Sequence, residues 1–350
     1  MSGPTLGTIV MIFIALVLGG ILIYITGNDV FGAYGIILRG AFGSTRKITE
    51  LFVKLIPILL MAFGISIAFK AQLWNIGAEG QFLMASITGT AIALYVNVPF
   101  PVRIILSFAA ATAAGALWAG LAAWLKNKFN ANEVITTLML NYIADYFLLY
   151  LINGPMQDPY SDLSQSDIIP EAMRLPFLIP QSRLHIGIFV LLAAVVLMIF
   201  FWKTKLGYQI DLVGQGDKVA TYAGLNVKKT VLVTMLISGA FSGAAGWLEM
   251  FGIQYRLMDG IVGNYGNIAT IIALLGGLNV YGIIAAALFF SILLCGGASM
   301  QRLTNIPYSV VDVIQGLIVI FIIARTRFTE QIMKIIHSGK NGKKEENSNE

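Results

Sequence analysis

Hydrophobic residues are concentrated in long runs along this chain, and short polar stretches separate the runs. A helix needs about 20 mostly apolar residues to cross a bilayer, because the hydrocarbon core is about 30 Å thick and each residue advances about 1.5 Å. The pattern predicts about ten transmembrane helices and therefore an all-α polytopic membrane protein. The predicted spans are 5–25, 51–69, 77–96, 102–125, 133–152, 184–202, 230–250, 266–278, 281–298 and 308–325.

Three apolar runs depart from this regular pattern. Run 266–278 is short for a full crossing and is separated from 281–298 by a glycine-containing break, so we expect it to be tilted or partly buried by its neighbours. The piece 30–42 is too short to span and is expected to lie at the interface or to re-enter the membrane. No Lys or Arg precedes Arg39, which favours a retained first span over a secretory signal.

The composition supports a membrane protein and argues against a soluble one. Apolar residues make up 57% of the chain and charged residues 12%, whereas a soluble domain carries about 25% charged residues to face water. The net charge is +5, but the basic residues lie between apolar runs, where they are typical of cytoplasmic anchors rather than of a nucleic-acid surface.

The charges of two loops predict the orientation. Segment 203–229 has five lysines and two aspartates, whereas 153–183 has four acidic residues and two arginines. Because these loops flank one span they lie on opposite sides, and the positive-inside rule places the basic loop in the cytoplasm. Ten spans then put both termini in the cytoplasm of a multi-pass cell-membrane protein. The basic residues between 39 and 47 would fall outside, against this rule.

The predicted domain organisation is a transmembrane domain over 1–325 and a cytoplasmic tail over 326–350. The tail is rich in Lys, Glu, Asn and Gly and lacks apolar periodicity, which is typical of disorder. The loop 153–183 contains five prolines and is expected to form an irregular external cap.

The stretch Trp74–Gln81 places polar side chains at the start of a membrane span. It contains Asn75, Glu79 and Gln81 together with two glycines. Burying such groups costs several kcal/mol unless they are paired or face water. Two interpretations stay open: a polar lining of a transport path, or a capped helix start with Glu79 near the positive end of the helix dipole.

A second polar group follows one stripe of the span 133–152. Glu133, Thr137, Asn141 and Asp145 recur every four residues, so they share one helix face. In a bilayer such a stripe faces protein or water. It either lines a path or supplies hydrogen bonds between helices.

Small residues recur at helical spacing in two later spans, in the sets Ala111, Gly115, Ala119 and Gly239, Gly243, Gly246. Their spacing predicts close helix packing.

The basic loop contains a candidate partner surface. Val219, Ala220, Tyr222, Ala223 and Leu225 predict a short amphipathic helix. Glycines at 216 and 224 bound it. Its apolar face either binds a partner protein or lies on the membrane surface.

Several catalytic motifs are missing from the chain. It contains no G-x-x-x-x-G-K-[ST] phosphate loop, no H-E-x-x-H, no G-x-S-x-G and only two histidines. We therefore expect no enzyme activity, no cofactor and no metal site of its own, and any nucleotide motor would be a separate chain.

Four segments together resemble a known family. Asn75-Ile-Gly-Ala-Glu-Gly-Gln81 is similar to a signature of the branched-chain amino acid, ribose and nucleoside group of ABC-importer permeases. Val213–Leu225 resembles the ATPase-docking segment of that group, and Gly239–Gly246 resembles its following span. Asn132–Asn141 is most similar to the nucleoside branch. The likeness covers about residues 30–325.

This resemblance implies a type II-like importer permease bundle and a set of partners. They are a second homologous permease, a cytoplasmic ATPase that binds the ATP, a lipoprotein that delivers solute outside, and membrane lipid. The expected solute is small and neutral, with nucleosides leading. The implied ATPase-docking residues are Gln215, Asp217, Lys218, Ala220, Tyr222 and Gly224.

The candidate path residues are Asn75, Gln81 and Asn141, which would read solute hydroxyls and base edges, and Glu79 and Asp145, which would orient helices or contact solute. Two rivals remain at this point. One is a sugar or branched-chain amino acid permease of the same group. The other is an ion-coupled secondary transporter with Glu79 or Asp145 as its ion site.

Overall fold

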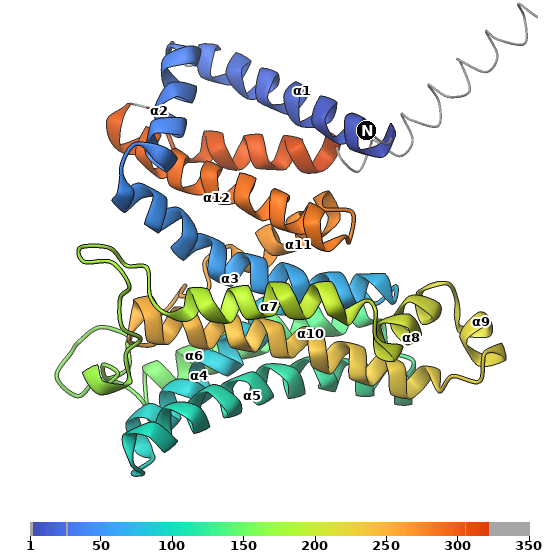
Figure 1. Cartoon of the computed structure of the whole chain (residues 1–350). Coiled ribbons are helices and arrows are strands. Elements are labelled where there is room, and N and C mark those ends of the chain that lie inside the picture. The colour runs from blue at the N-terminus through green and yellow to red at the C-terminus, as the bar shows by residue number, and fades with distance from the viewer. Residues whose placement is uncertain (1–2, 26, 305, 322–350) are drawn as a thin grey trace, which may run out of the picture. The chain divides into compact units, whose positions relative to one another are not determined.

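The computed structural model describes residues 3–25, 27–304 and 306–321 (Figure 1). The secondary-structure elements of the described residues are helices, and the only β-type pairings among these residues are three isolated bridges. This confirms the predicted all-α class. The predicted tail, 326–350, lies outside the described residues. The chain divides into two compact units, residues 44–292 and residues 1–43 with 293–350.

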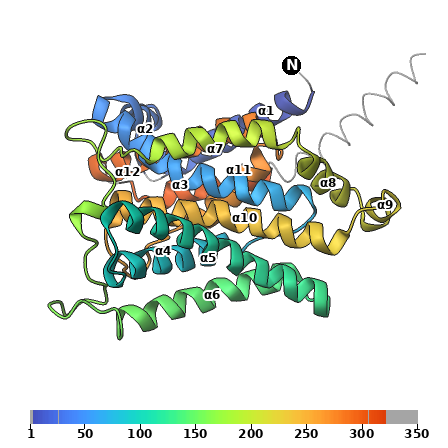
Figure 2. The same ribbon diagram turned by 60° about the horizontal axis from the view of Figure 1, so that its bottom comes forward.

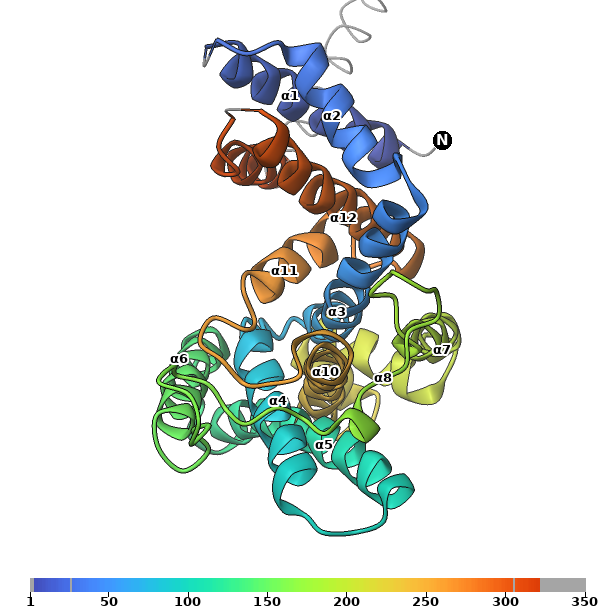
Figure 3. The ribbon, with the colours of Figure 1, turned by 90° about the vertical axis from the view of Figure 1, so that its left-hand side faces the viewer.

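The unit 44–292 is a bundle built around two long helices. α3 (Thr45–Lys70) and α10 (Val227–Glu249) pack on each other, and α10 also packs on α4 (Ala78–Tyr95) and α5 (Phe100–Phe129). Figure 3 looks along α10 and shows these three helices around it. α3 is apolar and buried along almost its whole length, so it forms the centre of the core.

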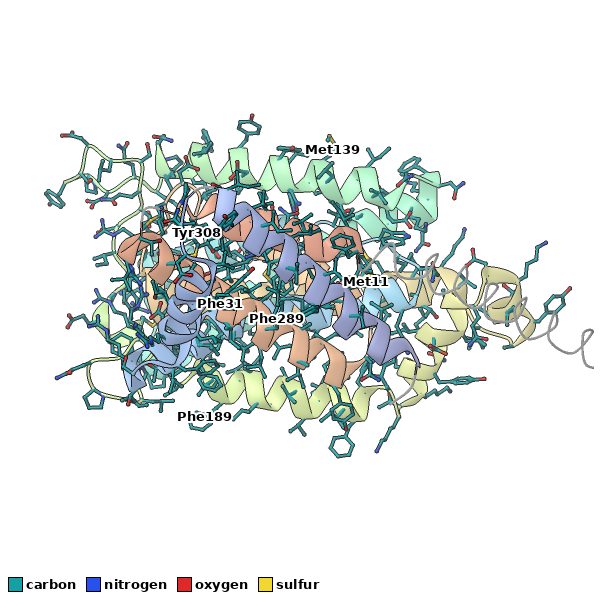
Figure 4. All side chains as sticks on the ribbon, turned by 90° about the horizontal axis from the view of Figure 1, so that it is seen from above. Met11, Phe31, Met139, Phe189, Phe289 and Tyr308 are labelled. Atoms are coloured by element: carbon teal, nitrogen blue, oxygen red, sulfur yellow. The ribbon has the colours of Figure 1, made fainter. Side chains whose placement is uncertain are left out.

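Further helices complete this unit. They are α6 (Glu133–Ile152), η1 (Glu171–Met173), α7 (Gly187–Phe201), α8 (Lys205–Gly214), α9 (Asp217–Tyr222), the π-helix η2 (Met250–Gln254), α11 (Tyr265–Leu275) and the first part of α12 (Val280–Leu303). Met139 on α6 and Phe189 on α7 point outward from the bundle (Figure 4), as apolar side chains facing lipid or a partner do.

The small-residue prediction for α5 and α10 is confirmed. A Cβ atom on Gly115 would lie 2.6 Å from the carbonyl oxygen of Gly239, and one on Gly243 would lie 3.0 Å from that of Ala111. Only glycine allows the two backbones to approach this closely, and close packing is the main source of helix association in lipid.

The two loops that set the predicted orientation lie at opposite ends of this bundle. The segment between α6 and α7 is at one end, and α8 and α9 are at the other (Figures 1 and 2). The former is largely irregular, as predicted, and is tied to the chain after α10 by the hydrogen bond from Ser166 N to Leu257 O, 2.9 Å. Which end is cytoplasmic stays a prediction.

The second unit contains α1 (Gly3–Ile25), α2 (Val30–Phe42), the end of α12 and a final helix, Ser309–Phe321. Glycines mark its contacts: a Cβ on Gly40 would lie 2.8 Å from Ser299 Oγ, and one on Gly19 would lie 2.7 Å from Ile314 Cδ1.

Within the described residues, five helices are long and apolar enough to cross a membrane, or seven if each of two bent pairs counts as one span. The five are α3, α5, α6, α10 with η2, and α12, and the bent pairs are α1 with α2 and α7 with α8. The predicted count of ten is not confirmed. α11 has only 11 residues, and the predicted span at 184 begins as a helix at Gly187.

Candidate functional site

The chain between α3 and α4 forms a break inside the bundle. Residues 73–77 are non-helical, yet Asn75 reaches Ser238, which is 11 residues beyond the start of α10. That separation corresponds to about 16 Å along a helix, so the break lies at membrane depth. Irregular backbone at this depth is tolerated only where protein or water satisfies its polar groups.

The side chains of Asn75 and Gln81 stabilise this break by hydrogen-bonding to each other and to nearby groups. Gln81 Nε2 donates to Asn75 Oδ1 at 2.8 Å, Asn75 Nδ2 donates to Ser238 Oγ at 2.8 Å, and the backbone N–H of Gly77 donates to Asn75 Oδ1 at 3.1 Å. Asn75 is 0% and Gln81 1% exposed. The two amides therefore face the protein interior, and solute contact by either one stays a prediction.

The polar stripe on α6 holds the same break from its other side. The Ile76 N–H donates to Thr137 Oγ1 at 3.3 Å, and Asn141 Nδ2 donates to the Ile76 carbonyl oxygen at 2.9 Å. Asn141 Oδ1 accepts from the N–H of Gly80 at 2.8 Å, which caps the first turn of α4. A Cβ on Gly80 would lie 2.9 Å from Asn141 Oδ1. The glycine therefore permits this close approach of α4 to α6.

Glu133, the first residue of the stripe, does not contact this break. Its Oε2 atom lies 2.7 Å from Lys126 Nζ at the end of α5 and forms an ion pair with it.

Glu79 caps a second helix, α11. Its Oε1 accepts from the N–H of Asn267 at 3.3 Å, while Asn264, the residue at the N-cap position of α11, makes no side-chain cap bond. Glu79 also lies in the first turn of its own helix, α4. The Glu79 carboxyl group thus lies at the N-termini of two helices, where the partial positive charge of the helix dipoles favours an anion.

The start of α11 is also tied to α3 by residues that the sequence analysis did not single out. Lys54 Nζ donates to the hydroxyl of Tyr265 at 2.7 Å and lies 5.3 Å from its ring centroid. Lys54 interacts electrostatically with Glu249, which is 3% exposed and accepts from Gln254 Nε2 at 3.1 Å. A lone lysine within the apolar run 51–69 was the available signal, because ionisable groups inside membrane spans are rare and usually functional.

Two further acidic residues, Asp145 and Asp259, lie in the same region. Asp145, the last residue of the α6 stripe, is half-buried and interacts electrostatically with Glu79 and with the exposed Asp259. Among the described residues, no group of His, Cys, Asp and Glu is placed to hold a metal ion. The N-termini of α4 and α11 thus meet at Glu79, with Asp145 of α6 beside them, and this meeting point is called the junction below.

The predicted short helix in the basic loop is confirmed as α9. Gly216 precedes it with φ 132° and Gly224 follows it with φ 77°, conformations that favour glycine. Ala220 is buried, whereas Tyr222 is 92% exposed. Gln215, Asp217, Lys218 and Gly224 are also exposed. Most of the predicted docking residues therefore lie on the surface.

α8 connects this end of the bundle to α3. Lys70 Nζ at the end of α3 lies 3.4 Å from Asp211 Oδ1 and 4.7 Å from the ring centroid of Trp202. Gly214 packs against the backbone of Lys70 so closely that a Cβ atom would overlap it. Beside α8, a groove of about 430 Å³ is lined by residues that include Lys205, Gln209, Leu225 and Lys229.

Comparison with known proteins decides the family. Residues 47–323 match the family described as "Branched-chain amino acid transport system / permease component". This chain belongs to that family. The predicted membership is thereby confirmed, and the protein is a multi-pass membrane permease component of a transport system.

Three curated relatives cover most of this permease. A glucose ABC transporter permease protein of Haloferax volcanii is 35% identical over 91% of this chain and 87% of its own length. A guanosine ABC transporter permease protein of Bacillus subtilis is 32% identical over 90% and 91%, respectively. A nucleoside ABC transporter permease protein of Lactococcus lactis is 31% identical over 90% and 89%. These relatives are ABC transporter components, and they differ in the solute that their names give.

Proposed function

We propose that this permease is the membrane subunit of an ATP-driven nucleoside importer. The observation that carries the proposal is the junction where the N-termini of α4 and α11 meet inside the bundle, because discontinuous helices whose N-termini meet at membrane depth form the solute sites of many transporters. Family membership supports the transport role. The names of two relatives support nucleosides as the solute.

The five predicted path residues divide into two roles in this proposal. Glu79 and Asp145 border the path, since both are only half-buried and lie between α4, α6 and α11. Asn75, Gln81 and Asn141 hold its wall, because each hydrogen-bonds across the break before α4. The path is completed by a second, homologous permease.

The proposed motor is a separate ATPase that docks on 213–225 in the cytoplasm, and a lipoprotein delivers solute at the opposite face. Both chain termini are cytoplasmic in this arrangement. Movement of α9 passes to α8, then through the Lys70–Asp211 contact to α3, and from Lys54 through Tyr265 to α11. Each step is a direct contact, so closure of the ATPase can displace the junction without a flexible linker in between.

Solute uptake tests the proposal. Radiolabelled guanosine, adenosine and uridine are offered to cells with and without this chain, with unlabelled glucose, ribose and leucine as competitors. We expect nucleoside uptake to disappear on deletion and to return only when the chain and its ATPase are both present. Uptake of glucose instead, as the relative from Haloferax volcanii suggests, would keep the ABC permease and change the solute. Loss of uptake on adding a protonophore at constant ATP would favour ion coupling.

A further inference from the structure

Two asparagines that the sequence analysis did not single out lie beside Glu79 at the start of α11. Asn264 and Asn267 are both exposed, and Asn267 Nδ2 donates to Asn264 Oδ1 at 2.8 Å. The backbone N–H of Asn267 is the group that Glu79 caps. The pair is therefore held in a fixed position relative to the carboxyl group.

The depth of this pair argues that it does not face lipid. The neighbouring Tyr265 contacts Lys54, which is nine residues beyond the start of α3, or about 14 Å along the helix. Exposing a primary amide to hydrocarbon without a hydrogen-bond partner costs about 2–7 kcal/mol. Two exposed amides at this depth consequently face water, a partner or a solute.

The hydrogen bond inside the pair determines what it presents. Because Asn267 donates to the Asn264 oxygen, the amide nitrogen of Asn264 and the amide oxygen of Asn267 remain available for further hydrogen bonds in these exposed side chains. An adjacent donor and acceptor, with the Glu79 carboxyl group as a further acceptor, match a base edge that has a carbonyl oxygen beside an N–H group. Guanine, hypoxanthine and uracil have this lactam edge, whereas adenine and cytosine have an amino group beside an unprotonated ring nitrogen.

We infer that Asn264 and Asn267 are specificity-determining residues of the solute path and read the lactam edge of a nucleoside base. This inference rests on the proposed nucleoside import and adds the recognition chemistry. A site built to hydrogen-bond a polar solute discriminates strongly against a solute with mismatched groups, because the groups of the site are then left unpaired.

The test measures KM for uptake of guanosine and of adenosine in cells that hold the complete transporter. Asn264→Ala and Asn267→Ala should each raise KM for guanosine about tenfold, as expected for one lost hydrogen bond, at an unchanged amount of permease in the membrane. Asn264→Asp replaces the outward donor with an acceptor and should shift preference from guanosine towards adenosine. Asn97→Ala is the matched control, since Asn97 is exposed outside the junction, and it should leave both KM values unchanged.

Three results would overturn the inference, and they differ from failure of the proposed function. Unchanged KM values in both alanine variants would show that the pair does not contact solute. Reduced uptake explained entirely by less permease in the membrane, with KM preserved, would assign the pair a structural role. An unaltered preference in Asn264→Asp would refute base reading even if the alanine variants bind more weakly. If the unmodified transporter takes up glucose but no nucleoside, the proposed function fails, and this inference fails with it.

Discussion

Replacing Gly266 with alanine should detach Glu79 from the start of α11. A Cβ atom at this position would lie 2.9 Å from Glu79 Oε1 and 3.0 Å from Cδ, and it would overlap Cγ. The Cγ atom is in the middle of the side chain, so no small rotation of the carboxyl group relieves the overlap. Glu79 must then adopt another rotamer, and the N–H of Asn267 loses its acceptor.

The expected cost follows from the interactions that are lost. Because Asn267 is exposed, losing this hydrogen bond costs about 0.5–1.5 kcal/mol, and removing an anion from a helix N-terminus costs about 0.3–1 kcal/mol more. Alanine restores up to about 1 kcal/mol of helix propensity relative to glycine. The net change is therefore a loss of about 1 kcal/mol in the free energy of unfolding.

A double-mutant cycle measures whether this loss passes through Glu79. The free energy of unfolding is measured by detergent titration in mixed micelles for the unmodified permease, Gly266→Ala, Glu79→Ala and the double variant. If the reasoning holds, Gly266→Ala destabilises the unmodified permease but becomes neutral or stabilising once Glu79 is alanine. An equal cost in both backgrounds would refute it. Gly35→Ala in α2 is the control, because a Cβ there meets open space.

Three further predictions concern other parts of the bundle. Tyr222→Ala should reduce coupling of ATP hydrolysis to uptake without changing the amount of permease, whereas Tyr208→Ala on α8 should not. Lys54→Met should destabilise the bundle by about 1–3 kcal/mol, because the Tyr265 hydroxyl loses its donor and Glu249 loses a nearby positive charge. Lys54→Met with Glu249→Met should recover part of that loss in the same unfolding titration. Burial lowers the pKa of His185, which lies in the loop before α7, from 6.5 to about 4, so stability should fall by about 3 kcal/mol as pH drops from 6.5 to 4.

The sign of the His185 prediction follows from proton binding. Between pH 6.5 and pH 4 the unfolded chain binds a proton at this residue, whereas the folded chain keeps it neutral, with Nδ1 accepting from the N–H of Gly187. His185→Gln should therefore flatten the pH dependence of the unfolding free energy over this range. An unchanged slope would show that other groups cause it. For the other two predictions, normal coupling in Tyr222→Ala, or strictly additive effects of the two methionine substitutions, would count against the reasoning.

The polar motif before α4 shows what the sequence pattern could predict and what it could not. Its amides, carboxyl group and glycines stood out because polar groups at membrane depth must be paired or hydrated. Both interpretations of the motif assumed local roles, either capping or lining. In the structure the contacts of the motif are with other helices: Asn75 donates to Ser238 on α10, Glu79 caps α11, and the N–H of Gly80 donates to Asn141 on α6.

Lys54 and Asn264 show what the pattern did not reveal. Lys54 is a single charged residue in an apolar run, and its neighbours in the chain do not indicate its partner. Asn264 pairs with Asn267, three residues further on, but the position of this pair beside Glu79 depends on the contact between α4 and α11. Lys54 meets Tyr265, 211 positions away in the chain, and such pairings have no signature in local periodicity.

Periodicity and charge sufficed for the membrane class, the helical architecture, close packing at the small-residue positions and the short helix between Gly216 and Gly224. These features depend on local properties: hydrophobic length, small residues at helical spacing, and glycine where φ is positive. The structure shows that α5 and α10 pack on each other at the small-residue positions. The site depended on tertiary structure, because a helix N-terminus inside a membrane must find its cap wherever the fold supplies one. Only the packing of α4, α6 and α11 decides that Asn141 and Glu79 are those caps.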